Sequence, residues 1–483
     1  MMSMTFPLPA SAGYCALIPN FLTGAECQAL IAASEGGGYA SAATDYPPSY
    51  RNNDRHVTDS SDLAATLTER LKEHAPPSLA ADGRQWRYDG INARFRFCRY
   101  RACQRFAIHQ DGVHFRHAGC RSHLTMLVYL TDGAAFAGGD TVFYAHGPGA
   151  DGGPQELGRV RPRAGSLLLF DHAIWHAGAE VDGGIKHVLR SDVLYRTDDT
   201  AASAGHQGYI WTLAALAHGQ MASGGRDATI RVWDADSRPM RCLAGHTQSV
   251  LGLAPLPGQR LASVSRDRTL RLWEVATGAC LTTVVAHDTA VLDVIALPGG
   301  TLATSGADGL IKLWTQEGTA IGTLAGHTGW IWQLAVLGNG RLASASEDGT
   351  VRTWDLAAMR CTAVLAGDQP LRTLLAVDGG LWTGDVAGRM ACWTNGADGW
   401  TRAAQWQAHD AAIRRLRHAG AGSIASCGED CVMRVWDTGS QAPVFAARHA
   451  NFVTDVLRCG AALVTSSYDG RMARHEHIAA TLA

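Results

Sequence analysis

The sequence has few of the features that mark secreted, membrane or nucleic-acid-binding proteins. Its 483 residues carry a formal net charge of −2, which gives no reason to expect nucleic acid or an anionic membrane as a partner. The twelve cysteines include no Cys-x-x-Cys pair, and no apolar run approaches the roughly 18 residues that a spanning helix needs. The first residues lack a positive region, and Pro7 and Pro9 interrupt their apolar stretch, so we expect no signal peptide. A reduced, cytoplasmic protein is predicted.

The composition is that of an ordinary globular protein, with 46% hydrophobic and 18% charged residues. A chain of this length is too long for one hydrophobic core, so two domains are expected. We predict a mainly β protein with a front domain over residues 1–196, a small polar linker over 197–204 and a repeat domain over 205–483.

The repeat domain is defined by markers that recur every 40 or 41 residues. Most markers are histidines, and most are followed about 27 residues later by a tryptophan. The markers are His206, His246, His287, His327, Asp368, His409 and His449, and the tryptophans are Trp233, Trp273, Trp314, Trp354, Trp393 and Trp436. Between each pair lie short alternating apolar runs separated by Gly and Asp turn signals, which predict four-stranded antiparallel units.

These repeats resemble the WD40 family, whose Gly-His…Trp-Asp units build β-propellers. The resemblance implies seven blades, with each marker histidine in a buried network with a Ser or Thr, a turn Asp and the Trp. The turn aspartates are Asp227, Asp267, Asp308, Asp348 and Asp430. The fifth repeat departs from the pattern, with Asp368 for the His and Ala387 for the turn Asp, and the seventh has His475 for the Trp. Residues 476–483 are a candidate last outer strand.

Three large aromatic residues follow their markers by three positions, where WD40 relatives bind partners: Tyr209, Trp330 and Phe452. Buried aromatic side chains dominate binding energy at interfaces. They are candidate anchors for a protein partner, and packing against adjacent loops or the front domain is the alternative.

The chemistry is expected in the front domain, where a strand-like stretch ends in His109-Gln110-Asp111. On a strand, residues two apart project from the same face, so the imidazole and the carboxylate would point into one cavity. One histidine and one carboxylate are two of the three ligands in the 2-His-1-carboxylate arrangement of non-haem Fe(II) oxygenases. Next comes HLTMLVYLTD, a strand with Thr125, Leu127 and Tyr129 on one face. Many short strands in series indicate a sandwich or a jelly roll.

The order of motifs over residues 88–196 resembles the prolyl-4-hydroxylase type of 2-oxoglutarate/Fe(II) dioxygenase. These motifs are His-x-Asp, Tyr-Leu-Thr, Gly-Gly-x-Thr-x-Phe, Phe-x-His-x-x-x-His-x-Gly and Gly-x-Lys. The resemblance implies a double-stranded β-helix (jelly roll) with flanking helices, in which His109, Asp111 and His176 bind Fe(II). The leading stretch NFLTGAECQALIAASE also fits, and Thr23 and Glu26 form a candidate capping box there.

By the same resemblance, 2-oxoglutarate and O2 fill the open positions on the iron, with ascorbate as a candidate further cofactor. Lys186 occupies the family's position for the distal carboxylate of 2-oxoglutarate, and Arg190 lies on the same strand face with a bidentate fork. Lys186 ranks ahead, and a shared role stays open. Tyr129 matches the tyrosine that hydrogen-bonds this carboxylate in relatives.

Two alternatives concern the site itself. His172, four residues before His176, is a competing metal ligand, although the family pattern favours His176. Residues 40–62, which include Arg-Asn-Asn-Asp-Arg, are predicted to be a polar loop beside the site. This loop is either a substrate lid or a cover over the barrel mouth.

The function expected from these features is a hydroxylase, most simply of a protein side chain such as proline, with the propeller capturing the protein substrate. Two alternatives remain at this point. One is a hydroxylase of a small molecule or free amino acid, with the propeller used for assembly. The other is a non-catalytic scaffold.

Overall fold

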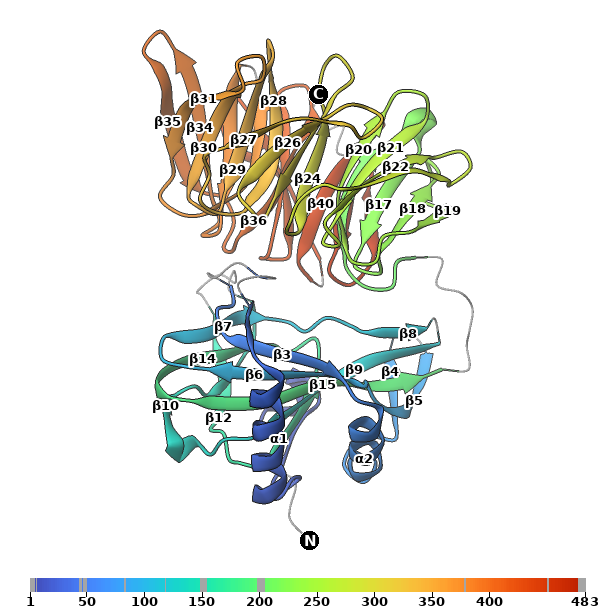
Figure 1. The fold of residues 1–483 in the computed structure, drawn as a ribbon, viewed down its shortest axis with the longest axis vertical. Helices are drawn as coiled ribbons and strands as arrows, with labels where there is room; N and C mark the ends of the chain where they lie inside the picture. Colours follow the sequence, from blue (N-terminus) through green and yellow to red (C-terminus); the bar gives the residue numbers. More distant parts are fainter. Residues whose placement is uncertain are drawn as a thin grey trace. The chain divides into compact units, whose positions relative to one another are not determined.

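The computed structural model describes residues 5, 7–42, 46, 50–81, 84–117, 119–147, 154–197, 205–377, 379–449 and 451–476. The chain is mainly β, as predicted, and divides into two compact units, residues 1–203 and 204–483. Residues 198–204, most of the expected linker, lie outside the described residues. Among the described helices, none combines the length and the apolar character needed to cross a membrane. Figure 1 shows the elements of each unit.

The front unit contains a large sheet in which β1, β13, β9, β15, β6, β3 and β2 lie side by side. Strand β5 also pairs with β15, β4 with β5, and β8 with β9. The strands are β1 (Cys15–Ile18), β2 (Ala40–Ser41), β3 (Asp54–Asp59), β4 (Ser78–Ala81), β5 (Arg84–Ile91), β6 (Arg94–Tyr100), β8 (Phe115–His117), β9 (Cys120–Tyr129), β13 (Leu167–Asp171) and β15 (Lys186–Arg196).

A second, smaller sheet has the order β10, β14, β11 and β12, with β7 also paired to β14. Its strands are β7 (Gln104–His109), β10 (Phe136–Gly138), β11 (Thr141–Tyr144), β12 (Glu156–Val160) and β14 (Trp175–Gly184). All described strand pairs in both sheets are antiparallel.

Two α-helices accompany the large sheet: α1 (Gly24–Gly37) and α2 (Ser61–Leu71). The capping box predicted for α1 is confirmed, because the Thr23 hydroxyl accepts from the Glu26 backbone N–H and the Glu26 carboxylate accepts from the Thr23 N–H. The Arg70 guanidinium on α2 forms a hydrogen-bonded ion pair with Glu26, and this contact lowers the pKa of that carboxyl to about 2. Short 3-10 turns lie at Ala10–Ala12 and Gly133–Ala135.

Alternation along the strands divides the front unit into two cores. Leu124, Met126 and Val128 of β9 pack in one core with residues of α2 such as Leu67 and Leu71. The intervening Leu127 and Tyr129 belong to the second core, which contains side chains of both sheets. This alternation matches the prediction for β9. It also explains why polar residues such as Thr125 face the second core, where the candidate site lies.

Residues 40–62 were expected to form a polar loop, and this expectation was wrong for much of the segment. Strands β2 and β3 extend the large sheet here, and α2 begins at Ser61. The β3 sequence Asp-Arg-His-Val-Thr-Asp is half-buried along most of its length and lacks the alternation that marks a strand. Residues 50–53 run beside β7, where Arg51 forms a β-bridge with Phe106 and the Ala107 N–H donates to the Tyr50 carbonyl. Residues 43–45 and 47–49 lie outside the described residues.

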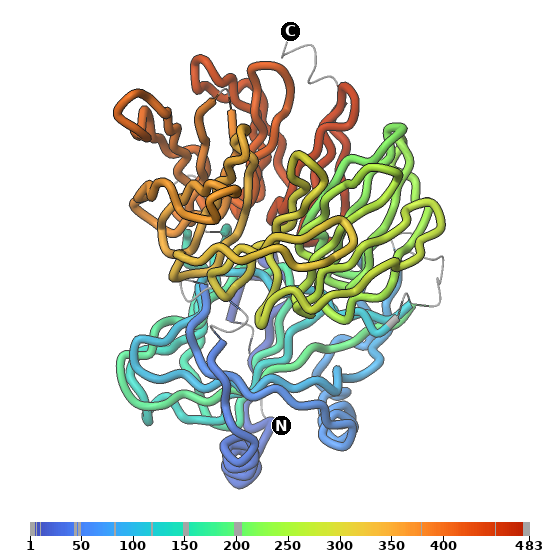
Figure 2. Tube along the Cα trace, turned by 45° about the horizontal axis from the view of Figure 1, so that its top comes forward, coloured from blue at the N-terminus to red at the C-terminus, as the bar shows by residue number. Residues whose placement is uncertain are grey.

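The second unit is a succession of small antiparallel sheets, which Figure 2 traces from green to red. Over the described residues there are six four-stranded sheets and one three-stranded sheet. The strands are β16 (Ile210–Ala215), β17 (Met221–Gly225), β18 (Thr229–Trp233) and β19 (Pro239–Ala244); β20 (Val250–Leu256), β21 (Arg260–Ser265), β22 (Thr269–Glu274) and β23 (Cys280–Val285); β24 (Val291–Ala296), β25 (Leu302–Gly306), β26 (Leu310–Trp314) and β27 (Ala320–Ala325); β28 (Ile331–Gly338), β29 (Arg341–Ser346), β30 (Thr350–Asp355) and β31 (Arg360–Ala366); β32 (Leu371–Val377), β33 (Gly380–Asp385), β34 (Arg389–Gly396) and β35 (Gly399–Gln407); β36 (Ile413–Gly420), β37 (Ser423–Gly428), β38 (Val432–Asp437) and β39 (Pro443–Arg448); and β40 (Val453–Cys459), β41 (Ala462–Ser467) and β42 (Met472–His475).

The first strands of successive sheets pack against one another, and β40 of the last sheet packs against β16 of the first, which closes the array. The closing contact is hydrogen-bonded as well as packed. The Asp455 carboxylate accepts from the Leu213 N–H at 2.9 Å, and the Thr454 hydroxyl donates to the Ile210 carbonyl at 2.6 Å. Residues 477–483, most of the segment proposed as a last outer strand, lie outside the described residues.

The turn between the second and third strands of each sheet requires a left-handed backbone. The residue at this position has a φ between +61° and +82° in every sheet. In four sheets it is glycine, which adopts this conformation without strain. In the other three it is Ala228, Arg268 or Cys431, whose side chains make the same turn less favourable.

Candidate active site

The three side chains predicted as metal ligands lie together in the front unit. His109 ends β7, Asp111 follows it, and the β7–β14 register places His176 opposite His109. The Nε2 atom of His109 lies 3.5 Å from Oδ1 of Asp111, and Nε2 of His176 lies 3.6 Å from Oδ2. The three side chains are buried, and their ligand atoms all lie within 4.8 Å of one another. This cluster is the right size to surround one metal ion.

Backbone carbonyls orient both imidazoles. Nδ1 of His109 hydrogen-bonds to the Ala107 carbonyl at 2.7 Å, and Nδ1 of His176 bonds to the Ile174 carbonyl at 2.9 Å. Each bond fixes the proton on Nδ1 and directs the Nε2 lone pair toward the centre of the cluster. Among the described residues, the buried Nε2 of His109 has no hydrogen-bond partner. An unpaired buried acceptor of this kind is what a metal-binding imidazole requires, so the residues present fit an iron ion.

The charge state of the cluster also suits a divalent cation. Burial lowers the pKa of His109, and it lowers the pKa of His176 to about 3, so both rings are neutral near pH 7. Burial opposes ionisation of Asp111, but the Arg190 guanidinium and the two imidazoles outweigh it and hold the pKa of that carboxyl well below its usual range. Neutral imidazoles and an ionised carboxylate are the forms that bind metal.

Two further side chains hold the Asp111 carboxylate. The Thr125 hydroxyl of β9 donates to Oδ2, and the Arg190 guanidinium of β15 forms a close ion pair with Oδ1. Arg190 had been considered as a binding group for the distal carboxylate of 2-oxoglutarate. Its contact with Asp111 instead holds the carboxylate that is predicted to bind the metal, and a guanidinium engaged by a buried carboxylate is poorly placed to bind a second one.

Lys186 lies in the same pocket, and in the described part of the chain it forms no ion pair with an acidic side chain. It is 3% exposed, and its Nζ donates to the Gly139 carbonyl at 2.6 Å and lies 5.2 Å from the centre of the Tyr100 ring. Burial lowers the pKa of this ammonium to about 8, since few charged groups are near enough to offset the loss of water. Between Lys186 and Arg190, the geometry therefore favours Lys186 for the distal carboxylate.

Tyr129 reaches the pocket only through Thr141. The Tyr129 side chain is fully buried, and its hydroxyl donates to Oγ1 of Thr141 at 2.8 Å. Thr141 lines the pocket and Tyr129 does not. Burial raises the pKa of the Tyr129 hydroxyl, which stays protonated. The Tyr129 hydroxyl therefore contacts a threonine of the pocket lining, and its direct contact with the cosubstrate stays a prediction.

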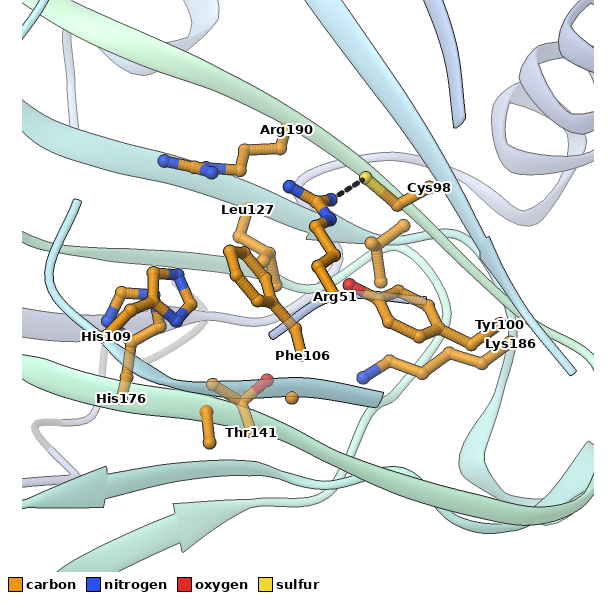
Figure 3. Close-up of a pocket in the computed structure, with 13 residues that line it drawn as sticks. Arg51, Cys98, Tyr100, Phe106, His109, Leu127, Thr141, His176, Lys186 and Arg190 are labelled. Carbon is orange, nitrogen blue, oxygen red and sulfur yellow. Dashed lines mark hydrogen bonds between the residues drawn. The ribbon is translucent and has the colours of Figure 1, made fainter. Parts of the chain in front are cut away.

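Figure 3 shows the pocket with the two histidines at one end and Tyr100 and Lys186 at the other. Between them lies Arg51, a residue that no sequence motif marks as part of a site. Arg51 is 3% exposed, and its hydrogen bonds go to Oδ1 of Asn53 at 2.7 Å and Sγ of Cys98 at 3.1 Å. A buried arginine in a segment expected to be a polar loop could not be recognised from spacing, because tertiary contacts with β7 place it.

His172, the competing ligand, lies outside the cluster. Its Nδ1 is 2.9 Å from the Thr125 hydroxyl, and its Nε2 is 2.8 Å from the Ser122 hydroxyl. Both ring nitrogens therefore have partners, and the ring supports Thr125 rather than presenting a lone pair to a metal. The family pattern favoured His176, and it is the His176 imidazole that joins the Asp111 carboxylate, while His172 meets Asp111 through its backbone carbonyl.

The marker histidines of the second unit have a different environment. In five repeats Nδ1 contacts the turn Asp, Nε2 contacts a Ser or Thr hydroxyl, and the Trp indole N–H donates to that hydroxyl. These sets are His206, Asp227, Ser223 and Trp233; His246, Asp267, Ser263 and Trp273; His287, Asp308, Thr304 and Trp314; His327, Asp348, Ser344 and Trp354; and His409, Asp430, Ser426 and Trp436. With both nitrogens engaged, these imidazoles have a structural role.

The two atypical repeats replace this network. In the fifth, Asp368 accepts from Arg402 and Gln405 instead of joining a histidine, while Trp393 still donates to Thr383. In the seventh, the Thr465 hydroxyl contacts both His449 and His475.

The three aromatic residues proposed as anchors are not equivalent. Tyr209 and Trp330 are partly exposed. Phe452 is only 1% exposed and packs against Tyr468 at 5.0 Å between ring centres. The interpretation of Phe452 as a surface anchor was therefore wrong, because the chain at this position turns the ring inward. Tyr209 also stacks on Tyr468, at 4.1 Å, which leaves Trp330 as the better candidate.

Models of known protein families match segments in both units of the chain. Residues 95–190 match the model of the 2OG-Fe(II) oxygenase superfamily, which covers β6 through part of β15. The chain contains an oxygenase domain followed by WD40 repeats. The model of the WD domain, G-beta repeat, matches residues 200–234, 237–274, 278–315, 318–355 and 400–437, the five repeats with the complete hydrogen-bonded network. A search of curated proteins found no match.

Proposed function

We propose that the protein is an Fe(II)- and 2-oxoglutarate-dependent hydroxylase of the prolyl-4-hydroxylase type, and that its WD40 propeller captures a protein whose side chain is the substrate. The observation that carries this proposal is the buried cluster of His109, Asp111 and His176, with neutral imidazoles and an unpaired Nε2. Iron bound there would supply the activation of dioxygen.

The residues of the chain would perform the binding and orientation. His109, Asp111 and His176 would hold the metal, while Thr125 and Arg190 keep the Asp111 carboxylate in place. The Lys186 ammonium would bind the distal carboxylate of 2-oxoglutarate. Overall, one oxygen atom of O2 converts a substrate C–H to C–OH, and the other enters succinate as 2-oxoglutarate loses CO2. Ascorbate, as a reductant that keeps the iron ferrous, belongs to the same proposal.

The propeller would raise the concentration of the captured side chain near the iron without adding contacts in the pocket. WD40 repeats generally mediate protein interactions, which supports a protein partner. Proline is proposed as the modified residue only by analogy with the prolyl-4-hydroxylase family. The twelve cysteines are all free, which supports a reducing, cytoplasmic location.

The test is release of succinate by the purified full chain supplied with Fe(II) and 2-oxoglutarate. His176→Ala should abolish both this release and Mn(II) binding measured by electron paramagnetic resonance. His146→Ala, at an exposed histidine outside the pocket lining, is the matched control and should retain both. A wild-type chain that binds no metal and releases no succinate would favour the scaffold instead.

A further inference from the structure

The pocket lining has more cationic side chains than are needed to pair with Asp111 and with the distal carboxylate of 2-oxoglutarate. Its lining includes Arg51, Lys186 and Arg190. Under the proposed function, one carboxylate of 2-oxoglutarate binds the metal and the other binds Lys186, while Arg190 is paired with Asp111. Arg51 is then the cation of this lining that has no assigned anion.

Among the residues that the structure describes, the surroundings of Arg51 supply no counter-ion. Its hydrogen bonds go to an amide oxygen and a thiol, on Asn53 and Cys98, and in the described part of the chain no carboxylate forms an ion pair with it. Arginine stays protonated in proteins, so it cannot relieve the cost of burial by losing its proton. A buried charge that faces a cavity and has no anionic partner among the described residues points to an anionic ligand.

The position of Arg51 limits where that anion lies. Its guanidinium packs on the Phe106 ring at 4.2 Å, and Phe106 in turn stacks on the His109 ring at 3.6 Å and 22°. One aromatic ring thus separates the guanidinium from a metal ligand. Figure 3 places Arg51 between the two histidines and Tyr100. The backbone bridge to Phe106 and the bond to Asn53, which is fully buried, fix Arg51 in this position.

We propose that Arg51 binds a carboxylate of the substrate that is hydroxylated, a few bonds from the carbon that is oxidised. The inference rests on the proposed function and narrows it, because a prolyl side chain has no such group. The substrate is then an acidic side chain of a captured protein or a free carboxylic acid. Arg51 orients this substrate and takes no part in the bond changes.

The test uses the full chain loaded with Mn(II) and saturated with N-oxalylglycine, an inert analogue that occupies the cosubstrate position. Propionate is the probe, and the measurement is the paramagnetic broadening of its proton resonances by the nearby Mn(II). We expect saturable broadening with the wild type and at least about tenfold weaker binding with Arg51→Met, because the charge-assisted contact is lost. Arg51→Lys should retain part of the binding, and propionamide should show none.

Arg51→Met and Arg51→Lys are first compared with the wild type by circular dichroism and thermal melting, so that misfolding is recognised. Broadening that is absent in the wild type, or unchanged in Arg51→Met, overturns the proposal. It is also overturned if Arg51→Met weakens N-oxalylglycine binding as much as Lys186→Met does, since Arg51 would then serve the cosubstrate. Failure to bind Mn(II) at all would instead contradict the proposed function.

A competition experiment distinguishes the two sources of the carboxylate. N-acetyl-aspartic acid amide presents only a side-chain carboxylate in a peptide-like setting, and free aspartate represents a small acid. Tighter displacement of propionate by the amide supports an acidic side chain of a protein, and tighter displacement by aspartate supports a free acid. Equal displacement by N-acetyl-asparagine amide, which has no carboxylate, would contradict the proposal.

Discussion

Both units bury histidine beside aspartate, yet the two arrangements have different purposes. In the propeller, His287 contacts Asp308 through Nδ1 and Thr304 through Nε2, so its ring is fully engaged. In the front unit, His109 uses Nδ1 to contact a backbone carbonyl, and its Nε2 is left without a partner among the described residues. The hydrogen bonding of the second ring nitrogen, rather than burial or proximity to an acid, therefore distinguishes the structural histidines of the propeller from His109, the predicted metal ligand.

The largest expected effects come from removing one histidine of each kind and measuring both metal affinity and stability. His109→Ala should reduce Mn(II) affinity at least about 100-fold. It should cost less stability than loss of a propeller histidine, because the Nδ1 bond to the Ala107 carbonyl and the stacking on Phe106 are lost but Nε2 leaves no hydrogen-bond partner unpaired. His287→Ala should leave Mn(II) affinity unchanged and lower the free energy of unfolding by roughly 3 kcal/mol, because Asp308 and Thr304 lose a buried partner. The measurements are metal titration and urea denaturation followed by tryptophan fluorescence. Equal stability losses in the two variants would contradict the distinction.

A second test separates capture from chemistry. Trp330 is partly exposed and lies 5.3 Å from the Trp332 ring, so Trp330→Ala removes apolar surface from the propeller without touching a metal ligand. We expect partner retention in a pull-down to weaken about 30-fold, as for an interface hot spot, with succinate release in the absence of substrate unchanged. Trp400→Ala, at a partly exposed tryptophan on the outer strand β35, is the matched control. If Trp330→Ala retains the partner as well as the wild type does, the partner binds another surface.

A third test uses the buried ammonium of the pocket. Because burial lowers the pKa of Lys186 to about 8, the neutral amine predominates above that pH and cannot pair with a carboxylate. The Kd for 2-oxoglutarate in the Mn(II)-loaded protein should therefore rise as pH increases through 8, by up to about tenfold per pH unit. Calorimetric titration between pH 7 and 9 measures this rise. Lys186→Arg, which stays charged, should show a flatter profile, and an equally steep profile there would assign the effect to another group.

The smallest expected effect concerns the turns of the propeller. Arg268 occupies the left-handed position that glycine fills in four other sheets, with a φ of +72°. Arg268→Gly should raise the free energy of unfolding by about 1 kcal/mol, because glycine adopts this backbone without strain. Gly349→Ala, at the equivalent turn with a φ of +81°, should lower it by a similar amount. Urea denaturation checks both, and a loss of stability in Arg268→Gly would mean that the side chain contributes more than the backbone strain costs.

Much of the architecture could be predicted because it depends on local patterns. The 40-residue period predicts repeated antiparallel sheets, and the alternation in β9 predicts which of its residues face the second core. The convergence of His109, Asp111 and His176 could be predicted from the motif order, although the spacing alone does not say which of two nearby histidines joins Asp111. That choice depends on the β7–β14 register, which pairs His176 with His109.

The parts that escaped prediction depend on contacts between distant segments. Arg51 enters the pocket because its backbone pairs with Phe106, some 55 positions away, and a charged sequence gives no sign of this burial. The Arg190 contact with Asp111 depends on the direction of a side chain of β15 and on the path of the chain just after β7. Phe452 was misjudged because its exposure is set by Tyr468 on the adjacent turn, which no periodicity reveals.

The contact of Asp455 with Leu213 joins residues 242 positions apart and ties the last sheet to the first. An open row of repeats can lose its outermost member and keep the rest, since each member depends only on its neighbours. Here no sheet is outermost. Removing the final strands would expose the apolar side of β16 at the opposite end of the array. A premature stop late in the gene would therefore destabilise the first sheet of the propeller.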